Sequence, residues 1–142
     1  MTTVVVTGTG TEIGKTWVTA AVLRALRARG IDAHGRKPVQ SFAPGDPTTD
    51  ATELAAAGGE HPEVVCPPHR WLSTPMAPPM AAVALGLPPF TVADLVAEIA
   101  PGSGLALVEG AGGLRAPIAE DGDTLALIEA LDPAAVLLVA PA

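Results

Sequence analysis

The sequence has 142 residues, enough for one domain with a hydrophobic core. It is 49% apolar but only 3% aromatic, so the core must consist mainly of aliphatic side chains and alanine. A net charge of -7 argues against a surface for duplex DNA or anionic membranes. The single cysteine, Cys66, excludes an intrachain disulfide and a cysteine-based zinc site. No apolar stretch reaches the ~18–20 residues of a membrane helix, so we expect a cytoplasmic protein that binds neither nucleic acid nor membrane.

The N-terminal region has the pattern of a strand, a glycine-rich loop, a helix and a second strand. Thr3–Thr7 is uncharged and β-branched, which is typical of a buried strand. A helix is expected over Lys15–Arg29, with Gly30 ending it, and a second strand over Ala33–Arg36, leading into Lys37. Apolar side chains of this helix recur three and four residues apart, and the expected face consists of Trp17, Val18, Ala21, Val22 and Ala25.

The remaining elements surround an irregular middle. Ser41–Thr49 predicts a loop, and residues 60–80, with many prolines, predict mostly irregular structure. The expected helices are Asp50–Ala57, a capped helix from Thr91 to Ile99, and Asp123–Leu131. The expected strands are Leu105–Val108, followed by Glu109, and Ala135–Ala140. Four parallel strands flanked by helices predict a three-layer α/β/α fold in one domain over residues 1–142.

The clearest motif lies between the first strand and the first helix. It is a glycine-rich loop, Gly8–Gly14, followed directly by Lys15 and Thr16. Glycines let the backbone fold around phosphates, and the helix start adds N–H donors and the positive end of its dipole. Lys15 would reach the outer phosphates and the Thr16 hydroxyl would bind Mg²⁺. Thr9 stands where a standard Walker A motif has its first glycine, so the loop is a longer variant.

Two other interpretations of this loop are weaker. A Gly-x-Gly-x-x-x-Gly string after a first strand also resembles a dinucleotide-binding loop. Such a site needs no Lys-Thr pair, however, and Asp32 precedes its strand instead of ending it. A glycine-rich turn without a ligand is the plain alternative. The register of strand, loop, Lys15-Thr16 and helix favours phosphate binding, and with it a fold of the P-loop NTPase type.

Three more residues are candidates for the same site. Glu109 ends a hydrophobic strand, where nucleotide-hydrolysing folds place their second acidic motif; otherwise it is a solvated residue beside the glycine turn Gly110–Gly113. Asp50 stands at a helix start and, on its own, is most simply an N-cap. Lys37 follows the second strand beside the crevice where open α/β sheets bind ligands, so it could stabilise a transferred phosphoryl group.

Taken together, the motifs resemble the dethiobiotin synthetase family. They are Gly8–Thr16, Lys37-Pro38-Val39-Gln40 and Val108–Gly113, with Pro75–Pro78 similar to the family's middle region. The match is collinear and spans nearly the whole chain. It implies an ATP-dependent carbon–nitrogen ligase of biotin synthesis, which joins CO₂ to 7,8-diaminononanoate, phosphorylates the carbamate with ATP and closes a cyclic urea.

The resemblance also implies roles for individual residues. The residues that would act close to the reacting groups are Lys15, Lys37 and Thr11. The residues that would hold Mg²⁺ are Thr16, Asp50 and Glu109, and Ser41 would contact the diamine. The residues that would bind ATP are Gly8, Glu12, Ile13, Gly14, Lys15, Thr16, Trp17, Asp50, Glu109, Gly110, Ala111 and Gly112. The family further implies a homodimer that uses ATP, Mg²⁺ and CO₂ or bicarbonate.

The sequence departs from the family in two respects, and other classes stay open. Ser41-Phe42 stands where the family often has Thr-Gly or Ser-Gly. Family members also continue with segments that bind the diamine carboxylate and the adenine, so we expect the N-terminal two-thirds of the family fold.

One alternative is a P-loop switch or partitioning ATPase, which usually has an additional lysine early in the loop, where Gly8–Ile13 has none. Others are a catalytically inactive nucleotide-binding remnant and an amidoligase acting on a corrin precursor.

Overall fold

A four-stranded parallel sheet forms the centre of the computed structural model, which describes residues 1–142. The strand order is β2-β5-β1-β8, with all neighbours parallel. The strands are β1 (Thr2–Gly8), β2 (Ala33–Arg36), β5 (Leu105–Glu109) and β8 (Ala135–Val139). In the register of the central strand, Val5 lies opposite Val108 on one side and Val136 on the other. All four strands predicted from the sequence are therefore confirmed.

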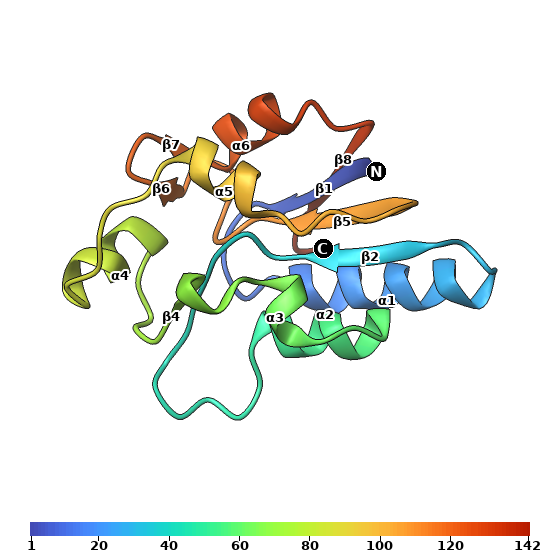
Figure 1. Ribbon diagram of the computed structural model, residues 1–142, viewed down its shortest axis with the longest axis horizontal. Coiled ribbons are helices and arrows are strands. Elements are labelled where there is room, and N and C mark those ends of the chain that lie inside the picture. The colour runs from blue at the N-terminus through green and yellow to red at the C-terminus, as the bar shows by residue number, and fades with distance from the viewer.

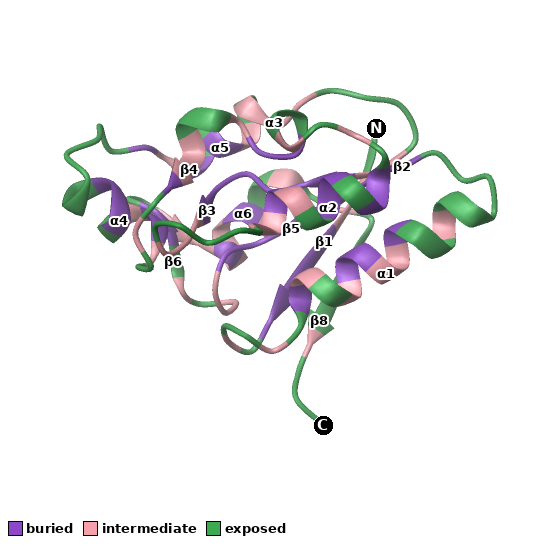
Figure 2. Ribbon diagram, turned by 90° about the horizontal axis from the view of Figure 1, so that it is seen from below, coloured by how far each residue is buried: buried purple, intermediate pink, exposed green.

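Helices cover both faces of this sheet (Figure 1). One face carries α1 (Lys15–Ala28) and α2 (Asp50–Gly58), and the other carries α5 (Val92–Glu98) and α6 (Thr124–Leu131). Side chains alternate between the faces along β5, because successive residues of a strand point in opposite directions. Leu107 packs with the α1 and α2 cluster, whereas Ala106 and Val108 pack on the opposite face. The three-layer α/β/α architecture is as predicted, and Figure 2 shows buried residues both on the inner strands and on the inner sides of the helices.

Residues 60–80 contain more regular structure than predicted. They include α3 (Pro62–Val65), the 3₁₀ turn η1 (Pro68–Arg70), the start of α4 (Pro78–Ala84) and β4 (Trp71–Leu72). β4 pairs in parallel with β3 (Gln40–Ser41), while β6 (Pro117–Ala119) pairs antiparallel with β7 (Gly122–Asp123). The prediction was wrong because a proline at the first helical position costs no hydrogen bond, and α3, η1 and α4 all begin that way.

The buried face of α1 also differs from the prediction. Its buried residues are Lys15, Thr19, Ala20 and Leu23. Trp17, expected on the apolar face, is 70% exposed. The helix has two stripes with suitable spacing, and packing selects the one on which Ala20 and Leu23 meet Leu54 of α2.

Threonine side chains begin two of the helices. Thr49 is the N-cap of α2 and Thr91 is the N-cap of α5, each within a capping box. Asp50 is thus the first residue of α2 and not its cap, which overturns the simplest interpretation of that aspartate. Its carboxylate is free for another role. None of the helices has the length and apolar character needed to cross a membrane.

Candidate active site

The glycine-rich loop carries the chain from the end of β1 to the start of α1. Gly14 has φ 98° and the non-glycine residue Glu12 has φ 56°, both in the left-handed region. A Cβ on Gly8 would clash with Ile13 and lie 3.0 Å from the carbonyl oxygen of Val139. Glycine at position 8 therefore allows the start of the loop to pack closely against the end of β8.

Unpaired backbone donors face outward at the start of α1. The first N–H of the helix with an acceptor is that of Val18, which donates to the Gly14 carbonyl at 2.9 Å. The N–H groups of Lys15, Thr16 and Trp17 consequently have no acceptor within the helix. Such free donors, together with the positive end of the helix dipole, favour an anion at this position. The Lys15 amine donates to the Gly10 carbonyl at 2.8 Å and so folds back over the loop.

A second glycine-rich turn, Gly110–Gly113, packs against the first. The N–H of Leu114 donates to the Gly8 carbonyl at 2.9 Å, which fastens the two loops together. A Cβ on Gly113 would lie 3.4 Å from Gly10, so the backbones approach closely here. The turn follows β5 directly, and it therefore holds Glu109 beside the phosphate loop.

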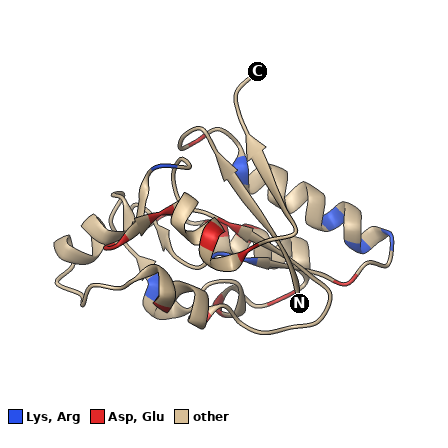
Figure 3. Cartoon of the chain, turned by 90° about the horizontal axis from the view of Figure 1, so that it is seen from above, with Lys and Arg blue, Asp and Glu red and all other residues tan.

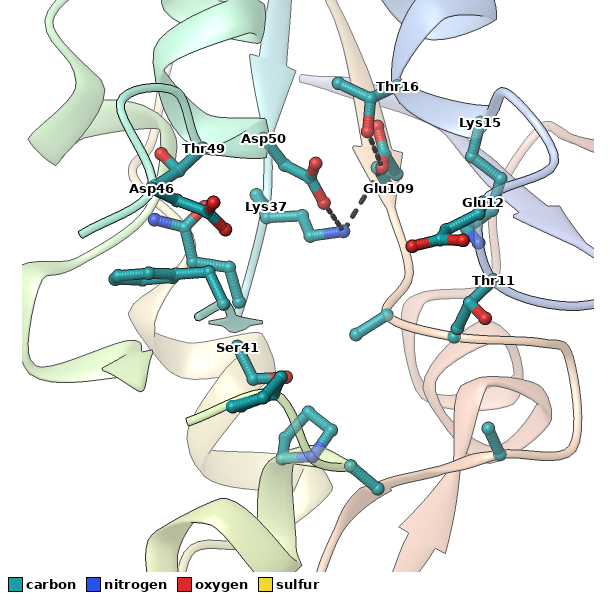
Figure 4. A pocket seen from close by; sticks show the side chains of 18 of the residues that line it. Thr11, Glu12, Lys15, Thr16, Lys37, Ser41, Asp46, Thr49, Asp50 and Glu109 are labelled. Carbon is teal, nitrogen blue, oxygen red and sulfur yellow. Dashed lines mark hydrogen bonds and ion pairs between the residues drawn. The ribbon is translucent and has the colours of Figure 1, made fainter. Parts of the chain in front are cut away.

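Four side chains meet in a charged network between β2, β5, α1 and α2 (Figure 4). The Lys37 amine lies 2.8 Å from Asp50 Oδ2 and 3.1 Å from Glu109 Oε1, and it donates to the Gly110 carbonyl at 2.8 Å. The Thr16 hydroxyl donates to the same Glu109 oxygen at 2.7 Å. Lys37 and Glu109 are only 2% and 1% exposed. The solvated alternative for Glu109 is thereby excluded.

The charges of this network depend on one another. Burial disfavours the charged form of Lys37, but the Glu109 and Asp50 carboxylates outweigh burial and raise its pKa. Burial likewise opposes ionisation of Asp50, yet the adjoining Lys37 charge lowers the pKa of that carboxyl. Burial, together with the charge of Lys37, lowers the pKa of Lys15. The site therefore holds two lysines and two carboxylates within one network of charges.

These groups line a cavity of about 730 Å³. The predicted site residues that line it are Thr11, Glu12, Gly14, Lys15, Thr16, Trp17, Lys37, Ser41, Asp50, Glu109, Ala111 and Gly112. Figure 4 shows the Lys37 amine in the middle of this group, with Thr11 and Ser41 on different sides of it. The Ser41 hydroxyl donates to the Met76 carbonyl at 2.6 Å.

Three predicted site residues lie outside the cavity lining. Gly8 instead borders a neighbouring hollow of about 540 Å³, together with Arg115 and Leu138. Gly110 acts through its carbonyl, which accepts from Lys37. Ile13 directs its side chain to Gly8 and does not line the cavity.

The structure adds residues to which the sequence analysis gave no role. Gln40 is 2% exposed, lines the cavity and accepts a hydrogen bond from the Ala51 N–H at 3.0 Å, which ties β3 to the start of α2. Phe42 and Asp46 also line the cavity, from the loop before α2. Only Gln40 carried a signal, because it lies three residues after Lys37 in the same motif.

The donor set fits a hard divalent cation. Glu109 Oε2 is buried without a hydrogen-bond partner. The side chains of Glu109, Asp50 and Thr16 belong to the same network, and each offers oxygen atoms that could bind a cation. No group of three or more histidine, cysteine or acidic side chains forms a self-sufficient metal cage. Mg²⁺ commonly takes one or two carboxylates and completes its shell with phosphate and water, which agrees with this arrangement.

Comparisons with known proteins place the chain in a family. A family model described as an AAA domain matches residues 2–142. The chain is 42% identical to the ATP-dependent dethiobiotin synthetase BioD of Methylobacterium nodulans, over 92% of this chain and 64% of that protein. It is 41% identical to the enzyme of the same name from Rhodococcus jostii, over 99% of this chain and 61% of that protein. The chain thus spans less than two-thirds of the length of these relatives. It belongs to the AAA-domain family that the model describes, and its predicted resemblance to the dethiobiotin synthetases is confirmed.

Proposed function

We propose that this chain is an ATP- and Mg²⁺-dependent ligase that converts 7,8-diaminononanoate and CO₂ into dethiobiotin. The observation that carries the proposal is the convergence of Lys37, Asp50 and Glu109 with the phosphate loop in one cavity. A phosphate loop alone serves many reactions. A buried second lysine beside it suits a reaction in which a carbamate and a phosphoryl group meet. The relatives named above, 42% and 41% identical to this chain, support the same reaction.

The proposed reaction has three balanced steps. One amine of the diamine attacks CO₂, loses a proton and becomes a carbamate. A carbamate oxygen attacks the γ-phosphorus of ATP, and ADP leaves. The second amine then attacks the carbonyl carbon of the mixed anhydride and loses a proton, and inorganic phosphate leaves as the cyclic urea forms. Positioning and charge neutralisation dominate such a phosphoryl transfer.

Residues of the network would divide this work. The Lys15 amine would turn from the Gly10 carbonyl to the outer phosphates, so that a neutral hydrogen-bond acceptor is replaced by a charged one. Lys37 would hold the carbamate and the transferring phosphoryl group, with Thr11 close by, and Ser41 would orient the diamine. Thr16, Asp50 and Glu109 would hold Mg²⁺, which neutralises phosphate charge when bound.

A complete assay tests the proposal. Purified protein is incubated with Mg-ATP, bicarbonate and 7,8-diaminononanoate, and both phosphate release and dethiobiotin are measured. We expect product only when all three substrates are present, and no product when EDTA removes Mg²⁺. Phosphate release that is independent of the diamine would contradict the ligase and favour a simple ATPase.

Two variants of α1 give a matched control. Lys15→Ala should abolish product, because it removes the cation aimed at the phosphates. Arg24→Ala removes an exposed cation from the same helix and should leave activity unchanged. Equal activity in both variants would contradict the role of the loop.

Two further features of the proposal concern assembly. The homodimer implied by the resemblance is tested by light scattering of the purified protein. The single domain over residues 1–142 is tested by one cooperative unfolding transition that coincides for circular dichroism and tryptophan fluorescence.

A further inference from the structure

The main cavity has an apolar wall that takes no part in the charged network. This apolar wall consists of two short segments, Phe42-Ala43 and Pro75–Pro78, which line the cavity on the Ser41 side (Figure 4). Hydrogen bonds hold the two segments side by side. The Ser41 hydroxyl donates to the Met76 carbonyl at 2.6 Å, and the Phe42 N–H donates to the Leu72 carbonyl at 3.0 Å. The apolar wall is therefore fixed by the pairing of β3 with β4.

Phe42 has no packing partner in the hydrophobic core. It is partly exposed and belongs to none of the three hydrophobic clusters. The other phenylalanine, Phe90, is 3% exposed and lies in the largest cluster. Met76, on the same wall as Phe42, is 43% exposed. Both side chains would gain free energy by leaving water, so this wall favours an apolar part of a ligand.

The substrate of the proposed reaction has such an apolar part. 7,8-Diaminononanoate carries both amines near one end, and a run of methylene groups separates them from the carboxylate. Ser41, proposed to orient the amines, directly precedes Phe42, and both residues line the cavity. Methylene groups that follow amines held at Ser41 therefore have the adjoining apolar wall within reach.

We propose that Phe42 is a specificity-determining residue, whose ring packs against the hydrocarbon chain of the diamine and favours long-chain over short vicinal diamines. This inference rests on the proposed function, which supplies the substrate. The dethiobiotin synthetases often have glycine at this position, so the ring is a feature of this chain. Packing against hydrocarbon carries no charge, and it leaves the phosphoryl transfer to the charged network.

Two diamines test this role of Phe42. 1,2-Diaminopropane has the same vicinal amines as 7,8-diaminononanoate but lacks the hydrocarbon chain. Binding of each is measured by calorimetry in the presence of Mg²⁺ and a non-hydrolysable ATP analogue. Phe42→Ala should weaken binding of diaminononanoate about 4- to 15-fold, the loss expected when one or two methylene groups return to water. Its affinity for diaminopropane should stay within about twofold, because that ligand does not reach the ring.

Two further variants serve as controls. Phe42→Leu keeps an apolar side chain of similar reach and should retain most of the affinity for diaminononanoate. Val83→Ala removes an apolar side chain that is 80% exposed on α4, outside the cavity, and should change neither affinity. Phe42→Ala should bind the ATP analogue as the wild type does and keep its midpoint of thermal unfolding, since the ring belongs to no core cluster.

Different outcomes overturn the two proposals separately. Unchanged affinity of Phe42→Ala for diaminononanoate, or an equal loss for both diamines, would overturn the role of Phe42 even if the wild type forms dethiobiotin. Wild-type protein that binds diaminononanoate in a Phe42-dependent way but forms no dethiobiotin would overturn the ligase and leave the role of Phe42 intact. Wild-type protein that binds neither diamine would overturn both.

Discussion

Lys37 and Glu109 form an ion pair that is almost completely removed from water. Their exposed fractions are 2% and 1%, and Lys37 Nζ lies 3.1 Å from Glu109 Oε1. Moving either charge out of water costs several kcal/mol, roughly, and the attraction between them offsets this cost only while both are present. Asp50 provides a second carboxylate at 2.8 Å, although its side chain is 43% exposed. The geometry of the proposed site and the stability of the fold are therefore coupled at these residues.

Removing one partner should reveal this coupling. We expect Lys37→Met to lower the free energy of unfolding by about 3 kcal/mol, because Glu109 becomes an uncompensated buried charge. Combining Lys37→Met with Glu109→Leu should restore most of the loss, since apolar replacement of a buried pair is often neutral. Urea denaturation of the three proteins measures the difference. A double variant less stable than Lys37→Met would contradict the explanation.

The sequence identified the residues of the candidate site, but it did not predict how they meet. Motif spacing pointed to Lys15, Thr16 and Glu109, because each role follows from local position beside a strand or helix. The burial of Lys37 could not be predicted in this way. It requires the start of α2 to approach the end of β5, a contact between segments far apart in the chain.

Helix caps link secondary structure to the site at the scale of elements. Thr49 begins α2 and accepts from the Thr52 N–H at 3.3 Å, while Thr91 begins α5 and accepts from the Asp94 N–H at 3.1 Å. The two caps share the same chemistry, but only Thr49 precedes a residue of the charged network. Comparing the two caps therefore separates the contribution of a cap to stability from its contribution to the position of Asp50.

The two alanine substitutions should differ in function and not in stability. Thr49→Ala and Thr91→Ala should each lower the free energy of unfolding by about 1 kcal/mol, as loss of an N-cap does. Only Thr49→Ala should also weaken Mg²⁺-dependent ATP binding, because Asp50 is the first residue of the frayed turn. Chemical denaturation and calorimetric titration with and without Mg²⁺ measure the two effects. Equal ATP affinities would show that α2 holds Asp50 without its cap.

The main strands and helices were predicted well, and the two-residue strands were not. β2 was predicted with the observed bounds, because a strand between a glycine-ended helix and a lysine-proline pair has few alternatives. The position of α1 was predicted correctly, but its buried face was wrongly assigned to the stripe that contains Trp17. Alanine suits both stripes, so the choice depends on the approach of α2. The two-residue strands β3 and β4 have no periodic signal and form only when the folded chain brings them together.

At the scale of the whole molecule, an ion pair fastens the proline-rich middle to the core. Arg70 of η1 donates to both carboxylate oxygens of Glu98 on α5, at 2.7 Å each. Its guanidinium also lies 4.4 Å from the centre of the Phe90 ring, and Phe90 belongs to the main hydrophobic cluster. Figure 3 shows the few basic residues of this acidic chain distributed over α1 and other segments. The Arg70–Glu98 pair is thus a link between distant segments that depends on charge.

This link should make stability fall in acid. Hydrogen bonds from Arg70 lower the pKa of Glu98 below its ordinary value of 4.5. A carboxyl with a lowered folded-state pKa stabilises the fold above that ordinary value, and the contribution is lost as the pH falls through the folded-state pKa.

The comparison of Glu98→Gln with the wild type isolates this contribution. The variant should be less stable by about 1 kcal/mol at pH 7, and the difference should shrink as the pH falls below 4.5. Thermal unfolding followed by circular dichroism between pH 7 and about pH 3 measures it, with Glu129→Gln on the exposed side of α6 as the control. A stability gap that stays constant down to pH 3 would mean that Glu98 acts through packing, because only the charge of the pair is removed by protonation.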